Sequence, residues 1–508
     1  METLRISPKT YTYRDFAPFF SGPIRVSLTQ NSLKNLESSH KRFLVQIETG
    51  KTIYGVNTGF GSLCQIKIDE KDQKKLQLNL VRSHASGVGE PLEPGLVRVI
   101  LVLKLLTFVK GYSGIRPILA KKIIQFLNND LLPVIPKKGS VGASGDLAPL
   151  GHMALSLIGE GHVFYKGKKL PTKTALKKAR IKPIVLHPKE GISLINGTQV
   201  STSLAIKALL DGDILIKTAD IAGALSVETS LSSLAGFHKN VHALKSHPGQ
   251  QIVARNVEKM LQGSMIVKSH EDCGKVQDPY SFRCIPHIHG ACRDGISHTG
   301  EMVNNEINSV SDNPLVLKNG DIVSSGHFHG EHIAQALDFM AISFSELGAV
   351  SERRIYFLMK GIEDVIPPFV TKNSGLESGY MITHVTAAAL ASENKTLAHP
   401  ASVDSLPTSG GQEDLVSMAP WAGRKLLKIQ QNLRMILAIE LMVSGAANHT
   451  AFPDLKPGKG TKPVLDLLNT ICKFEYGDRV YSGEMESLAS IIQSGGFLQT
   501  VNERISVD

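Results

Sequence analysis

Long apolar stripes at helical spacing fill the sequence from about residue 201 onward, and they constrain the possible folds more than any other feature. Apolar residues that recur every three or four positions form one face of a helix, and that face must be buried against other helices. Aromatic residues make up only 6% of the chain, so aliphatic side chains must supply the core volume. The pattern predicts a mainly α protein with a multi-helix bundle. Two of the stripes are Ile333, Leu337, Met340, Phe344 and Leu347, and Leu426, Ile429, Leu433, Ile436 and Leu437.

The first 200 residues differ, because short apolar runs there alternate with glycine and proline. Examples are SGPIRVS, IYGVNTGFGSL, LLPVIPKKGSVG and HPKEGISLING. Glycine and proline in this pattern mark turns and loops between short elements. We therefore predict a loop-rich N-terminal domain over residues 1–200 and a long-helix bundle over residues 201–508. The bundle would carry substrate-binding residues and the oligomer interface.

The chain is basic, with a formal net charge of +10. Much of the excess lies in the segment 165–182, YKGKKLPTKTALKKARIK. Its one aromatic residue is Tyr165, whereas proteins that bind single-stranded nucleic acid stack bases on several aromatic side chains. We interpret the segment as a solvated surface and expect no nucleic-acid partner.

The lack of a recognisable targeting signal and the low number of cysteines predict a cytoplasmic protein. The first residues, METLRISPKTYTYRDF, lack the apolar core of a signal peptide. The longest apolar run, Leu96 to Val109, contains Arg98 and Lys104, so we expect no membrane span. The cysteines are too few and too scattered for a disulfide scaffold, which favours a reducing compartment. They are Cys64, Cys273, Cys284, Cys292 and Cys472.

The stretch GSVGASGDLAPLGHMAL, residues 139–155, places one hydroxyl between very small residues just ahead of a predicted helix. Asp146 fits an N-terminal cap and Pro149 a first turn. A hydrolase nucleophile elbow needs glycine where Asp146 stands, and a phosphate-binding loop needs a lysine that is missing. A plain glycine-rich turn remains open for this stretch taken alone.

Chemical self-modification of the tripeptide Ala143-Ser144-Gly145 is also possible. If the loop is tightly bent, the Gly145 nitrogen can attack the Ala143 carbonyl carbon. Loss of water, including the Ser144 hydroxyl, would leave a methylidene-imidazolone ring, which is a strong electrophile. Protein side chains offer almost no electrophiles, so such chemistry normally needs a bound cofactor.

Six separated blocks make this sequence resemble the aromatic amino acid ammonia-lyases, and most closely the members that act on histidine. The resemblance covers nearly the whole chain. It implies a fumarase/aspartase-type helical core, a self-formed methylidene-imidazolone with no external cofactor, and a homotetramer whose active sites combine residues from several subunits. Besides the residues around Ser144, the blocks are YGVNTGFG (54–61), RSHASGVGE (82–90), PKEGISLINGTQ (188–199), KVQDPYSFRC (275–284), SDNPL (311–315) and VDSLPTSGGQEDLVSMAP (403–420).

The resemblance also implies roles for residues in these blocks. Arg283 would bind the substrate carboxylate, because a guanidinium donates two parallel hydrogen bonds to that group. Gln277 and Asn196 would help to orient the substrate. Tyr54 is favoured as the acceptor of the β-proton, with Tyr280 as the alternative. An ordinary phenol is protonated at neutral pH, so either tyrosine would need positive charge or amide donors nearby.

Three further positions bear on the choice of substrate. His84, Phe328 and Glu413 would lie against the substrate side chain, and a phenyl ring would leave the Glu413 charge buried without a partner. An imidazole can bond to both polar groups, so we predict L-histidine as substrate and urocanate and ammonia as products. Two residues depart from the family pattern, namely His327 in place of asparagine and Leu415 in place of histidine. The orientation of the substrate ring and the strictness of histidine specificity depend on them.

Other functions stay open at this stage. A lyase or aminomutase acting on phenylalanine or tyrosine would use the same electrophile, and an inactive helical oligomer could keep the same blocks. A zinc site is a further alternative, but its candidate ligands lack the C-x2-C pair of structural zinc sites, and we predict no metal. Those candidates are Cys284, His287, His289, Cys292 and His298.

Overall fold

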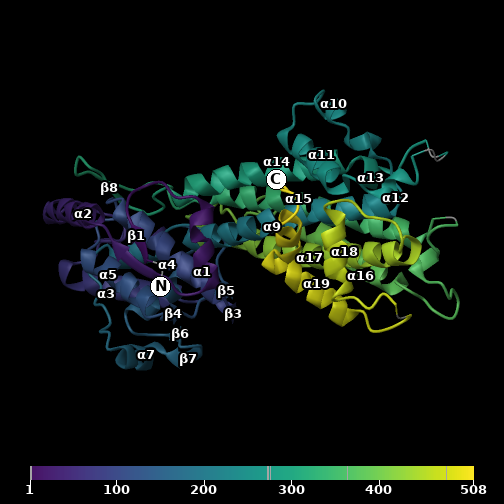
Figure 1. Ribbon diagram of the computed structural model, residues 1–508. Coiled ribbons are helices and arrows are strands. Elements are labelled where there is room, and N and C mark those ends of the chain that lie inside the picture. The colour runs from purple at the N-terminus through teal and green to yellow at the C-terminus, as the bar shows by residue number, and fades with distance from the viewer. Residues whose placement is uncertain (1–2, 272–273, 275, 363, 476) are drawn as a thin grey trace. The chain divides into compact units, whose positions relative to one another are not determined.

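The computed structural model of the chain describes residues 3–271, 274, 276–362, 364–475 and 477–508. It is mainly helical with a few short strands, which confirms the predicted fold class (Figure 1). Two compact units divide the chain. Unit 1 comprises Met1–Lys207, Gly300–Leu337 and Pro400–Arg424, and unit 2 comprises Ala208–Thr299, Asp338–His399 and Lys425–Asp508. The predicted boundary at residue 200 lies near the end of the first segment of unit 1, but this unit also takes in two later segments.

Unit 1 is built around one buried helix, α4 (Pro94–Val109). Even Arg98 and Lys104 in this helix are buried, which explains its apolar run without a membrane. The other helices of unit 1 are α1 (Ala17–Ser21), α2 (Gln30–Glu48), α3 (Gln73–His84), α5 (Pro117–Asn128), α6 (Leu147–Leu157), α7 (Thr172–Ala179) and α8 (Glu190–Ile195), with parts of α9 (Gln199–Thr229), α14 (Ile285–Ile307), α15 (Glu331–Met359) and α17 (Ala419–Ala451).

The strands of unit 1 form small separate sheets of two or three strands. β1 (Thr3–Ile6) pairs in parallel with β2 (Arg25–Leu28), with Thr3 opposite Arg25. The other pairings are antiparallel: β3 (Val88–Pro91) with β5 (Pro136–Lys138), β6 (His162–Tyr165) with both β4 (Leu132–Pro133) and β7 (Lys168–Pro171), and β8 (Leu315–Val316) with β9 (Ile322–Val323). Most of the basic segment 165–182 lies on β7 and α7.

Unit 2 contains the long-helix bundle, whose core is aliphatic with polar groups paired inside it. Arg354 and Glu440 are fully buried and form an ion pair. Helix α15 is long and apolar enough to cross a membrane, but 72% of its most apolar window is buried in the protein. Beyond the shared helices, unit 2 holds α10 (Lys239–His242), α11 (Pro248–Leu261), α12 (Met265–Lys268), α13 (Tyr280–Arg283), α16 (Met381–Leu397), α18 (Thr461–Asn469), α19 (Ser482–Ser494) and α20 (Gly496–Asn502).

The turn that joins α8 to α9 packs against the start of α6. The structure places Asp146 at the N-cap of α6, as predicted, but its side chain does not cap this helix. The carboxylate instead accepts hydrogen bonds from the backbone amides of Val200 and Ser201 at 2.7 and 2.8 Å and from the Ser201 hydroxyl. Asp146 therefore caps the start of α9 and fastens the glycine-rich loop to it.

Candidate active site

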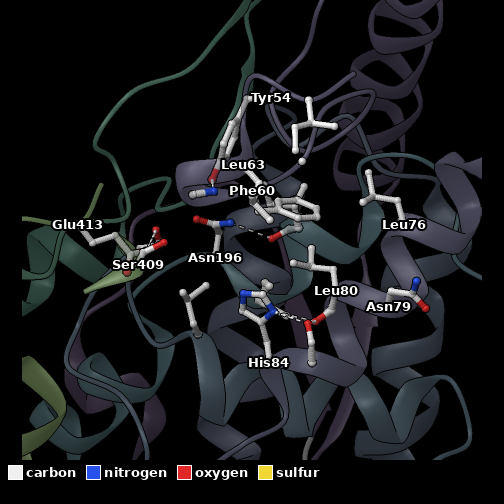
Figure 2. Close-up of a pocket in the computed structure, with 18 of the residues that line it drawn as sticks. Tyr54, Phe60, Leu63, Leu76, Asn79, Leu80, His84, Asn196, Ser409 and Glu413 are labelled. Atoms are coloured by element: carbon white, nitrogen blue, oxygen red, sulfur yellow. Dashed lines mark hydrogen bonds between the residues drawn. The ribbon is translucent and has the colours of Figure 1, made fainter. Parts of the chain in front are cut away.

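A cavity of about 450 Å³ opens in unit 1 and gathers five of the predicted site residues. Figure 2 shows its walls, which come from the loop after Tyr54, helix α3, helix α8 and the segment 409–413. The remaining walls are mostly apolar. The predicted residues that line the cavity are Tyr54, His84, Ser144, Asn196 and Glu413, and the unpredicted ones include Phe60, Leu63, Ile66, Ile68, Leu76, Leu80, Ile192, Ile195 and Ser409.

The tripeptide Ala143-Ser144-Gly145 is sharply bent. Ser144 has φ = 52°, in the left-handed region, and Gly142 and Gly145 have φ = 80° and 78°. A Cβ atom at Gly145 would lie 2.2 Å from the Gly197 carbonyl oxygen, so only glycine fits there. The loop therefore has the tight bend and the bare backbone that ring closure would require.

The Asn196-Gly197 turn stabilises this bend through backbone hydrogen bonds. The Gly197 amide donates to the Ser144 carbonyl oxygen at 3.3 Å, and the Asp146 amide donates to the Gly197 carbonyl oxygen at 2.8 Å. Burial raises the pKa of the Asp146 carboxyl to about 6, although its hydrogen bonds to Ser201 and Val200 oppose the increase. Backbone and side-chain hydrogen bonds thus hold the bent loop at residues 143–145 on both sides.

Glu413 reaches the same loop from a distant part of the sequence. The Ser144 hydroxyl donates to Glu413 Oε1 at 3.3 Å. The Thr408 hydroxyl donates to Glu413 Oε2 at 2.8 Å, and the backbones of Thr408 and Glu413 form an antiparallel bridge. A carboxylate has about four acceptor sites, so Glu413 keeps capacity for a ligand in the cavity.

Tyr54 sits under a closely packed loop. Its hydroxyl accepts a hydrogen bond from the Gly61 amide at 3.1 Å, and its ring meets Phe60 edge to face. Gln77 holds the loop on α3 by donating to the Gly55 carbonyl oxygen at 2.8 Å. Burial raises the pKa of Tyr54 and the Glu413 charge adds to the increase, while the Gly61 amide partly opposes it. The predicted amide donor is present, but it lowers the pKa of Tyr54 by less than burial raises it.

His84 ends helix α3 on the cavity floor (Figure 2). Its Nδ1 atom lies 2.8 Å from the Leu80 carbonyl oxygen, a partner that can only accept. Burial lowers the pKa of His84, so the ring is neutral near neutral pH. Together these contacts assign the proton to Nδ1 and leave the lone pair of Nε2 available to accept a hydrogen bond.

Three predicted residues belong to unit 2, whereas every residue lining the cavity belongs to unit 1. The Arg283 guanidinium lies 4.8 Å from the centre of the Tyr280 ring. The Tyr280 side chain is 69% exposed, and Arg283 Nε is buried without a hydrogen-bond partner. Gln277 precedes them as an exposed residue. Lys275 of the same block, like Cys273 before it, lies outside the described residues.

Phe328 and the two departures from the family pattern lie in unit 1 but do not line the cavity. Phe328 is half-buried and lies in the segment that joins β9 to α15. The His327 Nδ1 atom lies 3.0 Å from the Ser325 hydroxyl. Leu415 is 64% exposed, two residues after Glu413. Neither departure therefore alters the cavity walls of the single chain.

Two of the five candidate zinc ligands, Cys292 and His289, hydrogen-bond to other groups in the structure. The Cys292 thiol donates to the Ser343 carbonyl oxygen, and His289 Nδ1 lies 2.9 Å from the Asp220 carboxylate. Among the described residues, no group of three or more His, Cys, Asp or Glu side chains could hold a metal ion.

Sequence reasoning passed over one polar residue close to the reactive loop. Lys104 is fully buried on α4, and its ammonium donates to the carbonyl oxygens of Ser193 and Asn196. The available signal was a lysine inside a mostly apolar helix, since a buried charge is costly and needs a reason.

Comparison with known proteins gives consistent results. The family described as "Aromatic amino acid lyase" matches residues 11–470. Histidine ammonia-lyase from Aliivibrio fischeri is 44% identical over 97% of each chain, and that from Photorhabdus laumondii is 44% identical over 99% of this chain and 100% of the relative. These matches confirm the resemblance that the six blocks predicted.

Solved structures agree with the sequence relatives. Histidine ammonia-lyase from Trypanosoma cruzi superimposes with a TM-score of 0.90 at 34% identity, covering 100% of this chain and 96% of the other. Tyrosine aminomutase from Streptomyces globisporus gives a TM-score of 0.93 at 31% identity, covering 100% of both chains. The predicted ammonia-lyase-type helical fold is therefore confirmed.

Proposed function

The chain belongs to the aromatic amino acid lyase family, and from that premise we propose that it is a carbon–nitrogen lyase that eliminates ammonia from L-histidine to give trans-urocanate. The relatives that are 44% identical over nearly their whole length are histidine ammonia-lyases. The observation that carries the substrate assignment is the presence of His84 and Glu413 in the same cavity as Ser144.

The residues at 143–145 fit a self-formed methylidene-imidazolone. Ser144 already has the left-handed backbone conformation. Gly145 has no side chain to obstruct ring closure, and its surroundings leave no room for one. Residues 143–145 would hold such a ring, and it would supply an electrophile for the substrate amine. No external cofactor is then required.

The β-proton of the substrate is weakly acidic, so elimination also needs a base. Tyr54 is our candidate, because its hydroxyl faces the cavity and accepts from the Gly61 amide, a bond that favours the phenolate. Burial works in the opposite direction. Positive charge from Arg283 of another subunit would offset the cost of burial. Tyr280 is the alternative base, and otherwise it positions the substrate.

The ring of the substrate would bind between two acceptors. His84 presents the lone pair of Nε2, and Glu413 presents carboxylate lone pairs. An imidazolium ring has two N–H groups and can donate to both acceptors, and a neutral imidazole has one N–H group and can donate to either. A phenyl ring has none and would leave both buried acceptors without partners. Histidine is therefore favoured over phenylalanine, whose ring has no donor, and over tyrosine, whose single hydroxyl can donate to only one of the two acceptors. Phe328 would complete the ring pocket from a neighbouring subunit.

The substrate carboxylate would be bound by Arg283, with Asn196 and Gln277 orienting the backbone of the amino acid. Arg283 and Gln277 belong to unit 2, and we infer a homotetramer in which they serve the cavity of another subunit. Support comes from the exposure of Tyr280 and from apolar side chains at the surface of α15 and α16, which a partner would cover. Those side chains are Phe339, Ile342, Ile382 and Val385. The cytoplasmic location predicted from the sequence stays a prediction.

Ultraviolet spectroscopy tests the proposal. The purified protein is incubated with histidine, phenylalanine and tyrosine in turn, and the absorbance of each unsaturated acid is followed. We expect urocanate from histidine and little product from the other two. The control is Ser144→Ala, which cannot form the alkene because it has no hydroxyl to lose and should be folded but inactive. Absence of urocanate would refute the proposal, and a β-amino acid product would identify an aminomutase.

A further inference from the structure

Lys104 connects the core of unit 1 to the reactive loop. Its side chain is fully buried on α4, and Nζ donates to the Asn196 carbonyl oxygen at 2.6 Å and to the Ser193 carbonyl oxygen at 3.1 Å. Both acceptors lie in the last turn of α8 or directly after it. An ammonium at this position complements the negative end of a helix dipole.

The same peptide group that accepts from Lys104 also donates to the tripeptide. The Asn196 carbonyl oxygen receives the ammonium, and the amide of Gly197, on the other side of that peptide bond, donates to the Ser144 carbonyl oxygen at 3.3 Å. The chain of contacts therefore runs from the ammonium through one peptide unit to Ser144. Hydrogen bonds linked in this way polarise one another and become stronger, especially in a buried site.

The bonding of Lys104 differs from that of Lys189 and Lys425, two other lysines that are almost completely buried. Lys189 lies 3.2 Å from the Asp312 carboxylate, and Lys425 lies 2.5 Å from the Asp338 carboxylate. In the described part of the chain, the hydrogen bonds of Lys104 go to backbone carbonyls only, and the Phe108 ring lies 5.8 Å away.

A charge held in this way is costly to bury. Burial lowers the pKa of Lys104 to about 7, although the carboxylates of Asp312 and Asp146 oppose the decrease. A methionine would fill the same space without that cost, so packing alone does not explain a lysine.

We propose that Lys104 is a positioning residue that polarises the Asn196–Gly197 peptide and so draws electron density toward the Ser144 carbonyl oxygen. This inference rests on the proposed function, because it concerns the formation and reactivity of the electrophile. Lys104 acts through the peptide and touches neither the substrate nor the reacting carbon atoms.

The chemical consequence concerns the loss of the Ser144 hydroxyl. The Cα–H bond of Ser144 breaks, and its electron pair is first held on the Ser144 carbonyl oxygen. The pair then forms the Cα–Cβ double bond as the Cβ–Oγ bond breaks, and the hydroxyl leaves with a proton as water. Stronger donation from the Gly197 amide stabilises the charge on that oxygen. The same polarisation makes the completed alkene more reactive toward a nucleophile.

Intact-protein mass spectrometry tests this role with a readout that does not depend on turnover. Freshly synthesised wild-type, Lys104→Met, Lys104→Gln and Lys104→Arg proteins are followed over time for the mass loss of dehydration. A second measurement follows the addition of hydride from borohydride to the dehydrated protein. The matched control is Lys122→Met, because Lys122 also donates to a backbone carbonyl in unit 1, that of Lys182, but lies away from the cavity.

We expect Lys104→Met to fold and to dehydrate about tenfold more slowly than wild type, a smaller effect than the 10²–10³-fold typical of losing a direct oxyanion donor. Hydride addition should slow in parallel, Lys104→Arg should recover part of both rates, and Lys122→Met should match wild type. Dehydration and hydride addition at the wild-type rate in Lys104→Met would overturn the inference. If the Met variant does not fold, the same comparison applies to Lys104→Gln. A wild-type protein that never dehydrates would instead refute the proposed function.

Discussion

The Ser144 hydroxyl donates a hydrogen bond to the Glu413 carboxylate at 3.3 Å, although the two residues are 269 positions apart in the sequence. This contact joins the predicted reactive residue to a predicted determinant of substrate choice. If Ser144 loses its hydroxyl on ring formation, Glu413 Oε1 loses this donor and becomes available to the imidazole of the substrate. The formation of the electrophile would therefore also complete the ring-binding pocket.

We predict that Glu413→Gln weakens the reaction with histidine. The amide has the same shape but no charge, so a charge-assisted hydrogen bond worth about 1.5–3 kcal/mol is lost. The value of kcat/KM for histidine should fall by about tenfold to a hundredfold. Intact mass should show normal dehydration, because Ser144 and its backbone contacts are unchanged. An unchanged kcat/KM would mean that Glu413 does not contact the substrate.

The pH dependence should identify Tyr54. Burial raises the pKa of its phenol, so near neutral pH the group is almost entirely protonated, and the fraction able to accept a proton increases as pH rises. We therefore expect the contribution of Tyr54 to kcat/KM to rise with pH across the alkaline range, while the loss of charge on Lys104, whose pKa is about 7, opposes the rise. Glu413→Gln removes a negative charge that raises the pKa of Tyr54, so the rise should shift to lower pH. Tyr54→Phe should abolish it, and a Tyr54→Phe enzyme with the wild-type profile would assign the base elsewhere.

Mixed oligomers test whether subunits share active sites. Ser144→Ala and Arg283→Ala should each be inactive, because one lacks the electrophile and the other lacks the carboxylate-binding group. Co-expression with two different tags, followed by purification on both, yields oligomers that contain both variants. Some sites in them would combine an intact Ser144 with the intact Arg283 of another subunit, so activity should return. A mixed oligomer without activity would place both residues of a site in one chain.

Asp146 should contribute to stability through helix α9. Asp146→Ala leaves the buried amides of Val200 and Ser201 without their acceptor, and an unsatisfied buried group costs about 1–3 kcal/mol. Calorimetry should show a Tm several degrees below that of wild type. Ser201→Ala removes only the hydroxyl contact and should cause a smaller decrease. Equal Tm values for Asp146→Ala and wild type would show that the cap does not stabilise the fold.

Local sequence patterns predicted the elements that depend on neighbouring residues. The apolar stripes predicted the long helices, and Asp146 with Pro149 predicted the start of α6 within one turn. The role of the Asp146 carboxylate could not be predicted in the same way. Its partners lie more than fifty positions along the chain, and nothing in the loop sequence distinguishes a cap on α6 from a cap on α9.

Long-range contacts also limited the prediction of the site. The resemblance supplied the roles of His84 and Glu413, but not that Leu80 directs the proton of His84 to Nδ1. Lys104 served only to argue against a membrane span, because its carbonyl partners lie about ninety residues away. In the proposed tetramer, the position of Arg283 relative to the cavity depends on how the subunits assemble, which the sequence of one chain does not specify.

If the bend at Ser144 closes into the proposed ring, the cell does not have to supply the reactive group from outside the chain. A chain that builds its reactive group from three of its own residues needs no vitamin, no loading enzyme and no exchange with a free pool. Dialysis could not remove the group, and starvation for a coenzyme could not silence it. The number of active sites would then depend only on how much protein is synthesised and on the fraction of it that forms the ring.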